Sequence, residues 1–131
     1  MNIFSFPVRV YIEDTDAGGI VYYVNYLKYM ERARSEWLRQ RNLTQQGLFD
    51  IGIQLVVHRL ECRYIRPARL DDELEISVEA IDRSACRLGF HQQVTVRGEP
   101  LCDANVDIAC VESSTLKPVR WPSALAAVLR E

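Results

Sequence analysis

The sequence predicts an α+β fold in which a curved antiparallel sheet of about five strands wraps round one long helix. Five segments alternate apolar and polar residues, which is the period of a strand with one buried face. One segment, 24–40, instead repeats its apolar residues at helical spacing. A sheet that is apolar on one face needs cover on that face, and the long helix can supply it.

The predicted long helix runs from Val24 to Gln40. An apolar stripe recurs at i, i+4, i+7 and i+11, and we expect it to face the core: Tyr26, Met30, Ala33 and Trp37, widened by Leu27 and Leu38. The charged residues between them predict a solvated face: Lys28, Glu31, Arg32, Arg34 and Glu36. A second, short helix is expected over Ser123–Arg130, after Pro122.

The first predicted strand covers Pro7–Glu13, with Val8, Val10 and Ile12 on its buried face. A loop through Gly47–Gly52 is expected after the long helix. The other strands are expected over 56–64, 74–80, 86–96 and 102–110. The apolar parity of the second strand contains Val56, Leu60, Cys62 and Tyr64, and His58 shares it. All four cysteines fall on apolar parities, which favours buried thiols over a metal site.

Composition excludes several classes of protein. The chain has 131 residues, is 48% hydrophobic and carries 16 basic against 18 acidic residues, a net charge of -2. This balance gives no charge excess for a nucleic-acid partner, and no apolar run is long enough for membrane insertion. We expect one domain over residues 1–131 and, without a secretory leader, a cytoplasmic location.

The junction between the first strand and the long helix can carry chemistry. Two acidic residues, Asp14 and Asp16, lead through Gly18 and Gly19 into the helix. A helix N-terminus presents free N–H groups that can hold an oxyanion, and a nearby carboxylate can act as nucleophile or general base. An aspartate before a helix is also common capping chemistry, so the pattern alone leaves both roles open.

Residues 14–26, DTDAGGIVYYVNY, resemble the D-x-D-x-x-G-h-V-x-x-x-x-Y signature of hot-dog-fold acyl-CoA thioesterases, in the 4-hydroxybenzoyl-CoA thioesterase-like branch. Two further segments, 31–34 and 67–74, are similar to those of its Tol-Pal-associated members. The resemblance runs from about Arg9 to Pro122. It implies the hot-dog fold and hydrolysis of an acyl-CoA to free acid and CoA, with no cofactor and no metal.

By this resemblance, Asp16 matches the catalytic carboxylate, as nucleophile or as base for water. Gly19 and the backbone N–H of Tyr23 match the positions that polarise the thioester carbonyl. Tol-Pal-associated members commonly carry histidine where this chain has Tyr23. The substrate-binding candidates are Tyr22, Asn25, Arg63 and Arg66. The two arginines suit CoA phosphates, although a solvated strand face is the alternative.

Other carboxylates and histidines are alternatives to Asp16. Asp14 is expected to hydrogen-bond at the strand end, and Glu31 to face solvent or pair with Arg34. His58 is expected in the core and His91 at the surface. The resemblance also implies a homodimer or homotetramer. A hot-dog hydratase or dehydratase, a non-catalytic binding module, and acyl carrier protein in place of CoA stay open as alternatives.

Overall fold

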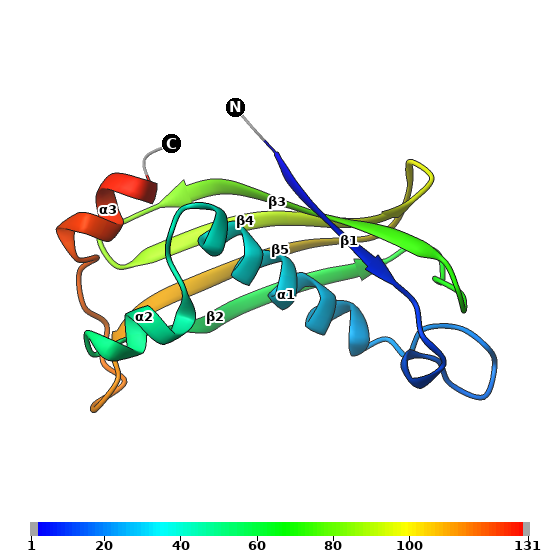
Figure 1. The fold of residues 1–131 in the computed structure, drawn as a ribbon, viewed down its shortest axis with the longest axis horizontal. Helices are drawn as coiled ribbons and strands as arrows, with labels where there is room; N and C mark the ends of the chain where they lie inside the picture. Colours follow the sequence, from blue (N-terminus) through cyan, green and yellow to red (C-terminus); the bar gives the residue numbers. More distant parts are fainter. Residues whose placement is uncertain (1–2, 130–131) are drawn as a thin grey trace.

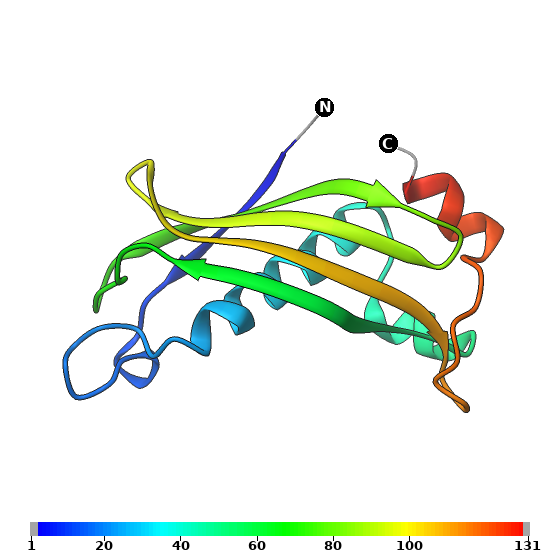
Figure 2. The same cartoon turned by 180° about the vertical axis from the view of Figure 1, so that it is seen from behind.

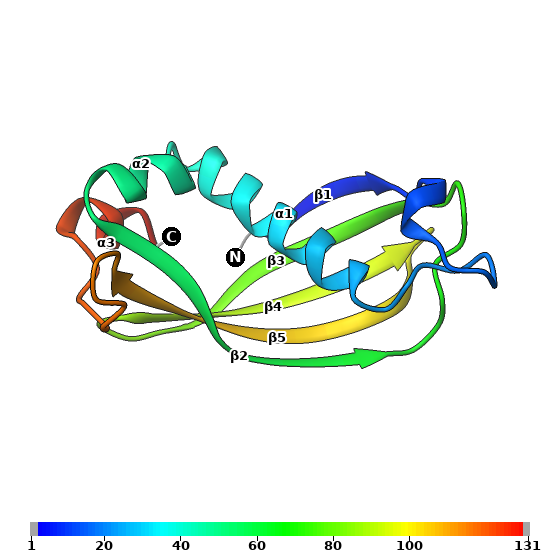
Figure 3. The same ribbon diagram turned by 90° about the horizontal axis from the view of Figure 1, so that it is seen from below.

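The computed structural model describes residues 3–129 and contains one antiparallel sheet with helices on one of its faces (Figures 1 and 3). The strands are β1 (Phe4–Arg9), β2 (Ile53–Tyr64), β3 (Glu73–Arg83), β4 (Arg87–Val96) and β5 (Glu99–Glu112). Their order across the sheet is β1-β3-β4-β5-β2, and every neighbouring pair is antiparallel. The predicted α+β architecture is therefore confirmed.

The helix α1 (Asn25–Gln40) lies across the curved sheet, and Val24 is its N-cap (Figure 3). The predicted stripe is buried: Tyr26, Met30, Ala33 and Trp37 are all nearly inaccessible to solvent. The ring of Trp37 meets Phe90 of β4 edge-on at 5.0 Å. Burial of this stripe against the sheet holds the start of α1 at one end of the sheet, where the acidic junction lies.

Arg34 is not on the solvated face, so that part of the helix prediction was wrong. Its side chain is buried at 9% exposure, and its Nη1 donates to Oε1 of Gln92 on β4 at 2.8 Å. The amide of Gln92 in turn donates to the carbonyl of Met30 at 3.0 Å. A buried polar group needs such partners, and Gln92, which lies on the apolar parity of its strand, supplies them.

The first strand ends earlier than predicted. β1 stops at Arg9, and a single turn of 3-10 helix, η1 (Ile12–Asp14), follows. Val8 and Val10 are buried as expected, but Ile12 is 74% exposed. The carboxylate of Asp14 accepts a hydrogen bond from the N–H of Tyr11, which pulls the chain out of strand geometry before Ile12.

The expected loop over Gly47–Gly52 is mostly a helix, α2 (Gln45–Asp50). Thr44 caps it, because its hydroxyl accepts a hydrogen bond from the N–H of Gly47 at 2.9 Å. The third helix, α3 (Ser123–Leu129), confirms the second predicted helix, although Arg130 lies outside the described residues. Figure 2 shows α2 and α3 at the opposite end of the sheet from the acidic junction.

A bulge in β2 overturns the predicted parity of its first half. Val57 pairs with Ile108 and Arg59 with Asp107, so His58 is the extra residue. The bulge turns Leu55 and Val57 toward the helices. Val56 therefore takes the opposite face, and His58 is exposed rather than in the core.

The remaining strands agree with their predicted faces. Leu74, Ile76 and Val78 of β3 are fully buried, as are Cys102 and Cys110 of β5, whereas Cys62 and Cys86 are half-buried. Among residues 3–129, no helix has the length and apolar character that a membrane span requires.

Candidate active site at the start of the long helix

A tight turn holds Asp16 between η1 and α1. The N–H of Asp16 donates to the carbonyl of Ile20 at 2.9 Å, and the N–H of Gly19 donates to the Asp16 carbonyl at 3.0 Å. Gly19 has a φ of +78°, a left-handed conformation that glycine adopts without strain. The paired glycines thus serve the turn itself, and the side chain of Asp16 is exposed on it.

The two oxygens of the Asp16 carboxylate have different surroundings. Oδ1 accepts a hydrogen bond from the N–H of Gly18 at 2.9 Å. No described residue donates to Oδ2, so this oxygen is free to act on a ligand. A Cβ added to Gly18 would lie 3.3 Å from Oδ1, which shows how closely the backbone approaches the carboxylate.

Asp14 and Asn25 hold the turn against the helix. The Asp14 carbonyl accepts hydrogen bonds from the N–H of Tyr22 at 3.0 Å and from the side-chain amide of Asn25 at 2.9 Å. The Asp14 carboxylate is bonded to the N–H of Tyr11. Asp14 therefore has the hydrogen-bonding role expected of it, and the Asn25 amide already has a partner within the chain.

The backbone N–H of Tyr23 lies directly before the helix. The N–H of Tyr22 donates to the Asp14 carbonyl, and the N–H of Asn25 donates to the Tyr22 carbonyl at 2.9 Å. Within residues 3–129, the Tyr23 N–H has no acceptor. A free N–H at the N-terminus of a sixteen-residue helix carries the partial positive charge of the helix dipole.

Tyrosines surround this backbone position. The Tyr64 hydroxyl donates to the Tyr23 carbonyl at 3.2 Å, and the two rings meet edge-on at 6.0 Å. The rings of Tyr22 and Tyr23 are 5.0 Å apart. The Tyr26 hydroxyl accepts from the N–H of Ala68 at 2.9 Å, and burial raises the pKa of Tyr26 above its ordinary value. The phenol of Tyr26 is therefore a neutral hydrogen-bonding group near neutral pH.

An open cleft of about 240 Å³ lies beside these tyrosines. The helix start and the chain that follows β2 form its walls: Ile20, Val21, Tyr23, Tyr26, Tyr64, Ile65, Arg66 and Pro67. The cleft brings together two of the predicted site residues, Tyr23 and Arg66. Asp16 lies on the turn that leads into the wall at Ile20.

The two predicted phosphate-binding arginines do not lie together. Arg66 is on the cleft and forms an ion pair with Glu99 at 2.6 Å. Arg63 lies on the outer face of the sheet, where it lines a separate hollow with Glu61 and Asp103. A single small ligand in the cleft would therefore contact Arg66 alone of the pair.

Two of the other candidates have partners away from Asp16. Glu31 is exposed and accepts a hydrogen bond from the hydroxyl of Ser35 at 2.7 Å. His91 is part-buried on the outer face, with its Nε2 2.8 Å from Asp103.

Sequence reasoning missed the part that Tyr64 and Tyr29 play here. Tyr64, expected in the core, is 43% exposed at the end of β2 and touches the helix start through Tyr23. Tyr29 is 1% exposed, and among residues 3–129 no group meets its hydroxyl in hydrogen-bonding geometry. Burial raises its pKa, and the nearby Asp14 carboxylate raises it further. A second tyrosine one turn after Tyr26 is the signal that could have indicated a buried phenol behind the acidic turn.

The chain is similar to known thioesterases over nearly its whole length. The profile of the thioesterase-like superfamily matches residues 10–129. The acyl-CoA thioester hydrolase YbgC of Escherichia coli is 40% identical over 131 residues, covering 99% of this chain and 98% of that protein. The acyl-CoA thioesterase YbgC of Haemophilus influenzae is 43% identical over 127 residues, covering 96% and 93% of the two chains.

A solved structure shows the same fold. The probable thioesterase of Bartonella henselae superposes with a TM-score of 0.88 at 32% identity, covering 92% of this chain and 100% of that one. With the hot-dog arrangement and nearly full-length similarity both present, this chain belongs to the thioesterase-like superfamily.

Proposed function

We propose that this protein is an acyl-CoA thioesterase that hydrolyses the thioester to a free acid and CoA, with Asp16 as its catalytic carboxylate. The observation that carries the proposal is that one short segment, 16–23, holds both a carboxylate oxygen of Asp16 without a donor and the unbonded N–H of Tyr23, among residues 3–129. The names of the Escherichia coli and Haemophilus influenzae relatives support the substrate class.

The chemistry needs one oxygen nucleophile and one oxyanion donor. Either Asp16 takes a proton from water as the water oxygen attacks the carbonyl carbon, or its own oxygen attacks and, once the C–S bond breaks, leaves a mixed anhydride that water then hydrolyses. In both routes the carbonyl oxygen gains negative charge, which the Tyr23 N–H and the helix dipole stabilise. The C–S bond then breaks, and CoA leaves as a thiolate that takes up a proton.

Gly19 contributes its left-handed backbone conformation to this proposal. Its N–H already donates to the Asp16 carbonyl, so that N–H is not a second oxyanion donor while the turn is intact. The left-handed φ of Gly19 keeps the turn tight and presents the Asp16 side chain at the surface. The polarising role belongs to Tyr23, and its phenol is not required for it.

Substrate and partner contacts extend the proposal. Arg66 on the cleft suits a CoA phosphate, and Tyr22 offers an exposed ring next to Tyr23, which lines the cleft. Arg63 would reach CoA only from the outer face of the sheet, and Asn25 acts by holding the turn. β2 is an edge strand with a free side, and a homodimer or homotetramer would cover it and the exposed tyrosines near the cleft.

Thiol release with a thiol-reactive dye tests this function across short, long and aromatic acyl-CoAs and acyl carrier protein thioesters. Turnover by the parent and its loss by about 100-fold or more in folded Asp16→Asn would support both reaction and residue. Full activity in the variant would overturn the role of Asp16. A folded parent that binds acyl-CoA without turnover on any substrate would indicate a binding module.

Tyr23→Phe tests the assignment of the backbone N–H. The variant keeps the N–H and loses only the phenol, so we expect kcat within about 3-fold of the parent. A drop as large as that of Asp16→Asn would instead assign the reaction to the hydroxyl group. Tyr11→Phe is the matched control, because Tyr11 is also exposed, at 62% against 58% for Tyr23, and lies outside the cleft.

A further inference from the structure

Two thiols lie side by side near the end of β2. Cys62 of β2 and Cys102 of β5 place their Sγ atoms 3.1 Å apart. Both are free thiols, and Cys62 is half-buried whereas Cys102 is fully buried. The other two cysteines, Cys86 and Cys110, form no thiol–thiol hydrogen bond within residues 3–129. The proposed hydrolysis makes no use of this thiol pair.

The strand register brings the two cysteines together. Cys62 pairs with Ala104 of β5, and Cys102 pairs with Tyr64 of β2. The cysteines are therefore diagonal neighbours on antiparallel strands, which start farther apart than a directly opposed pair. A disulfide bond is about 2.05 Å long, so its formation needs a shift of about 1 Å that draws the end of β2 along β5. A bond formed under such strain is easily reduced, which suits a reversible modification.

The two thiols have different surroundings. Burial raises the pKa of the Cys102 thiol, and the hydrogen bond with Cys62 raises it further. Cys102 is therefore a poor first nucleophile, because the thiolate is the reactive form of cysteine. Cys62 is the more accessible of the two, so an oxidant that arrives from solvent meets Cys62 first.

The thiol pair lies next to the tyrosine that holds the helix start. Burial raises the pKa of the Tyr64 phenol, and the nearby Cys62 thiol raises it further. The hydroxyl of Tyr64 donates to the carbonyl of Tyr23 at 3.2 Å, and Tyr23 carries the unbonded N–H on which the proposed reaction depends. A series of neighbouring groups thus runs from Cys102 through Cys62 and Tyr64 to the helix start.

We propose that Cys62 and Cys102 form a reversible disulfide when the protein meets hydrogen peroxide, and that this bond loosens the contact of Tyr64 with the helix start. The Cys62 thiolate attacks one peroxide oxygen, the O–O bond breaks, and the departing hydroxide takes up the proton that Cys62 lost, which leaves a sulfenic acid and water. The Cys102 sulfur then attacks the Cys62 sulfur, and the S–O bond breaks. The second hydroxide takes the Cys102 proton, so two thiols and one peroxide give one disulfide and two waters.

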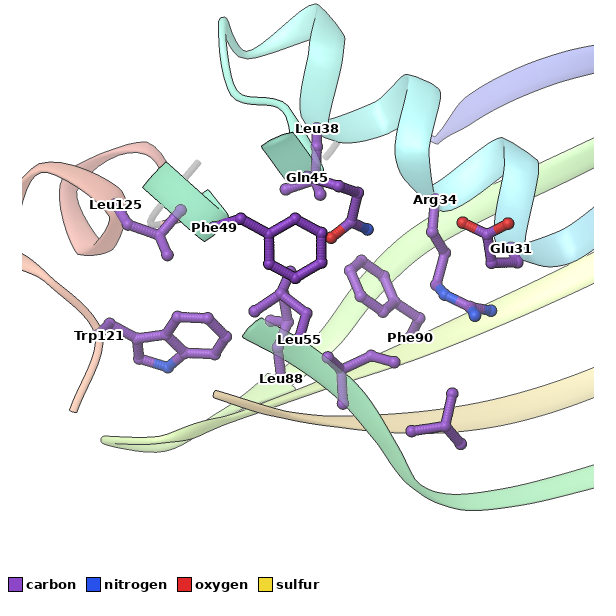
Figure 4. A pocket seen from close by; sticks show the side chains of 12 residues that line it. Glu31, Arg34, Leu38, Gln45, Phe49, Leu55, Leu88, Phe90, Trp121 and Leu125 are labelled. Carbon is purple, nitrogen blue, oxygen red and sulfur yellow. The ribbon is translucent and has the colours of Figure 1, made fainter. Parts of the chain in front are cut away.

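This inference goes beyond the proposed hydrolysis, and only its effect on turnover rests on that proposal. The thiol pair is also separate from the cavity of about 320 Å³ at the other end of α1, whose wall includes Phe49 of α2 and Trp121 (Figure 4). Neither Cys62 nor Cys102 lines that cavity. Oxidation should therefore change the helix start and leave α2 unchanged.

Mass spectrometry and thiol counting test whether the bond forms. Hydrogen peroxide should lower the mass of the parent by two hydrogen atoms and remove two of its four thiols, and dithiothreitol should reverse both changes. A peptide map of the oxidised parent should join Cys62 to Cys102, which decides the pairing even if a variant does not fold. A parent that keeps four thiols while glutathione is oxidised in the same solution would overturn the proposal, as would oxygen retained on Cys62 without a cross-link.

Four serine variants test the location of the bond. Cys62→Ser and Cys102→Ser should each prevent the joint loss of two thiols. Cys110→Ser and Cys86→Ser are the matched controls, because Cys110 is as deeply buried as Cys102 on the same strand and Cys86 is half-buried like Cys62. Both controls should still form the bond. Loss of the bond in a control, with the bond retained in Cys62→Ser, would place it at another pair and overturn the proposal.

Hydrogen exchange tests the link to the helix start without substrate. Amides of residues 20–26 should exchange about 3-fold or more faster in the oxidised parent than in the reduced parent, and those of α2 should not change. Tyr64→Phe keeps the ring and lacks the hydroxyl that reaches Tyr23, so oxidation should still form the bond without altering this exchange. Equal exchange at residues 20–26 in the two forms of the parent would overturn the link.

Turnover of an acyl-CoA tests the consequence for the proposed reaction. It is followed by loss of thioester absorbance, because dithiothreitol and the protein thiols react with a thiol dye. We expect turnover to fall by about 3-fold or more on oxidation, to return with dithiothreitol, and to stay at its untreated rate in peroxide-treated Cys62→Ser. Unchanged turnover in an oxidised parent would contradict the effect on the reaction, whereas a reduced parent without turnover would count against the hydrolysis alone.

Discussion

The two ends of α1 present opposite kinds of site. At its start, Asp16 is exposed on a turn held by backbone hydrogen bonds, with Tyr23 and Tyr64 beside an open cleft. Toward its end, Arg34 is buried against Gln92, and apolar side chains enclose a cavity. The first region offers free hydrogen-bonding groups at the surface, and the second offers burial. Substitutions at the start should therefore change turnover, and substitutions at the end should change stability.

The largest effect on stability is expected from Gln92→Ala. Gln92 is fully buried and makes two hydrogen bonds, so its loss leaves the Arg34 guanidinium and the Met30 carbonyl without this partner and opens a cavity. We expect the free energy of unfolding to fall by about 2–4 kcal/mol, measured by urea denaturation. The exposed Gln40→Ala is the control, and a similar loss there would break the contrast between the two regions.

Within the acidic turn, Asp14→Ala should reduce stability more than Asp16→Ala. The Asp14 carboxylate accepts from Tyr11 N–H and lies near the buried hydroxyl of Tyr29. We expect a loss of about 1–2 kcal/mol for Asp14→Ala and less for the exposed Asp16→Ala, by thermal or urea unfolding. Turnover, by contrast, should fall more in Asp16→Ala than in Asp14→Ala. A larger stability loss at Asp16 would mean that its carboxylate supports the fold rather than the reaction.

Gly19→Ala tests the backbone conformation of the turn without removing any side chain. An added Cβ would meet no atom within 4 Å, so the left-handed φ of +78° is the only cost. We expect a loss of about 1 kcal/mol in unfolding free energy, with turnover reduced as the turn relaxes. In Gly18→Ala the new Cβ would instead press on Asp16 Oδ1, so turnover should fall with a smaller loss of stability. Unchanged turnover in both variants would mean that the reaction does not depend on the conformation of this turn.

The same contrast explains what the sequence could predict. Alternation and helical spacing reflect burial, so the buried stripe of α1 and the faces of β3 and β5 were predicted correctly. The bulge at His58 was not, because one inserted residue reverses parity without changing composition. Arg34 was misplaced because its burial depends on Gln92, fifty-eight positions away in the sequence.

The candidate site was only partly predictable from sequence. The order of Asp14, Asp16 and the glycines identified the turn, because those residues lie close together within the segment 14–19. The approach of Tyr64 to Tyr23, and the separation of Arg63 from Arg66, depend on how β2 ends beside the helix start. Contacts between distant segments leave no mark in local periodicity.

The smallest predicted effect concerns the outer face of the sheet, which belongs to neither end of α1. Burial raises the pKa of Asp103, but hydrogen bonds from Gln93 and His91 outweigh it and hold that pKa below its ordinary value of 3.8. A carboxyl whose pKa is lower in the folded state stabilises the fold above its unfolded pKa. That contribution is lost as pH falls through the folded pKa.

Asp103→Asn should therefore lower the free energy of unfolding above about pH 4. The gap in unfolding free energy between parent and variant should close as the pH falls further. Urea unfolding measured from neutral to acid pH checks this expectation. Gln93→Leu removes one of the two hydrogen bonds and should show a smaller gap over the same range. A gap that widened toward acid pH would reverse the sign of the argument, because it would require a raised pKa for Asp103. Turnover at neutral pH should be the same in all three proteins, since both ends of α1 keep their contacts.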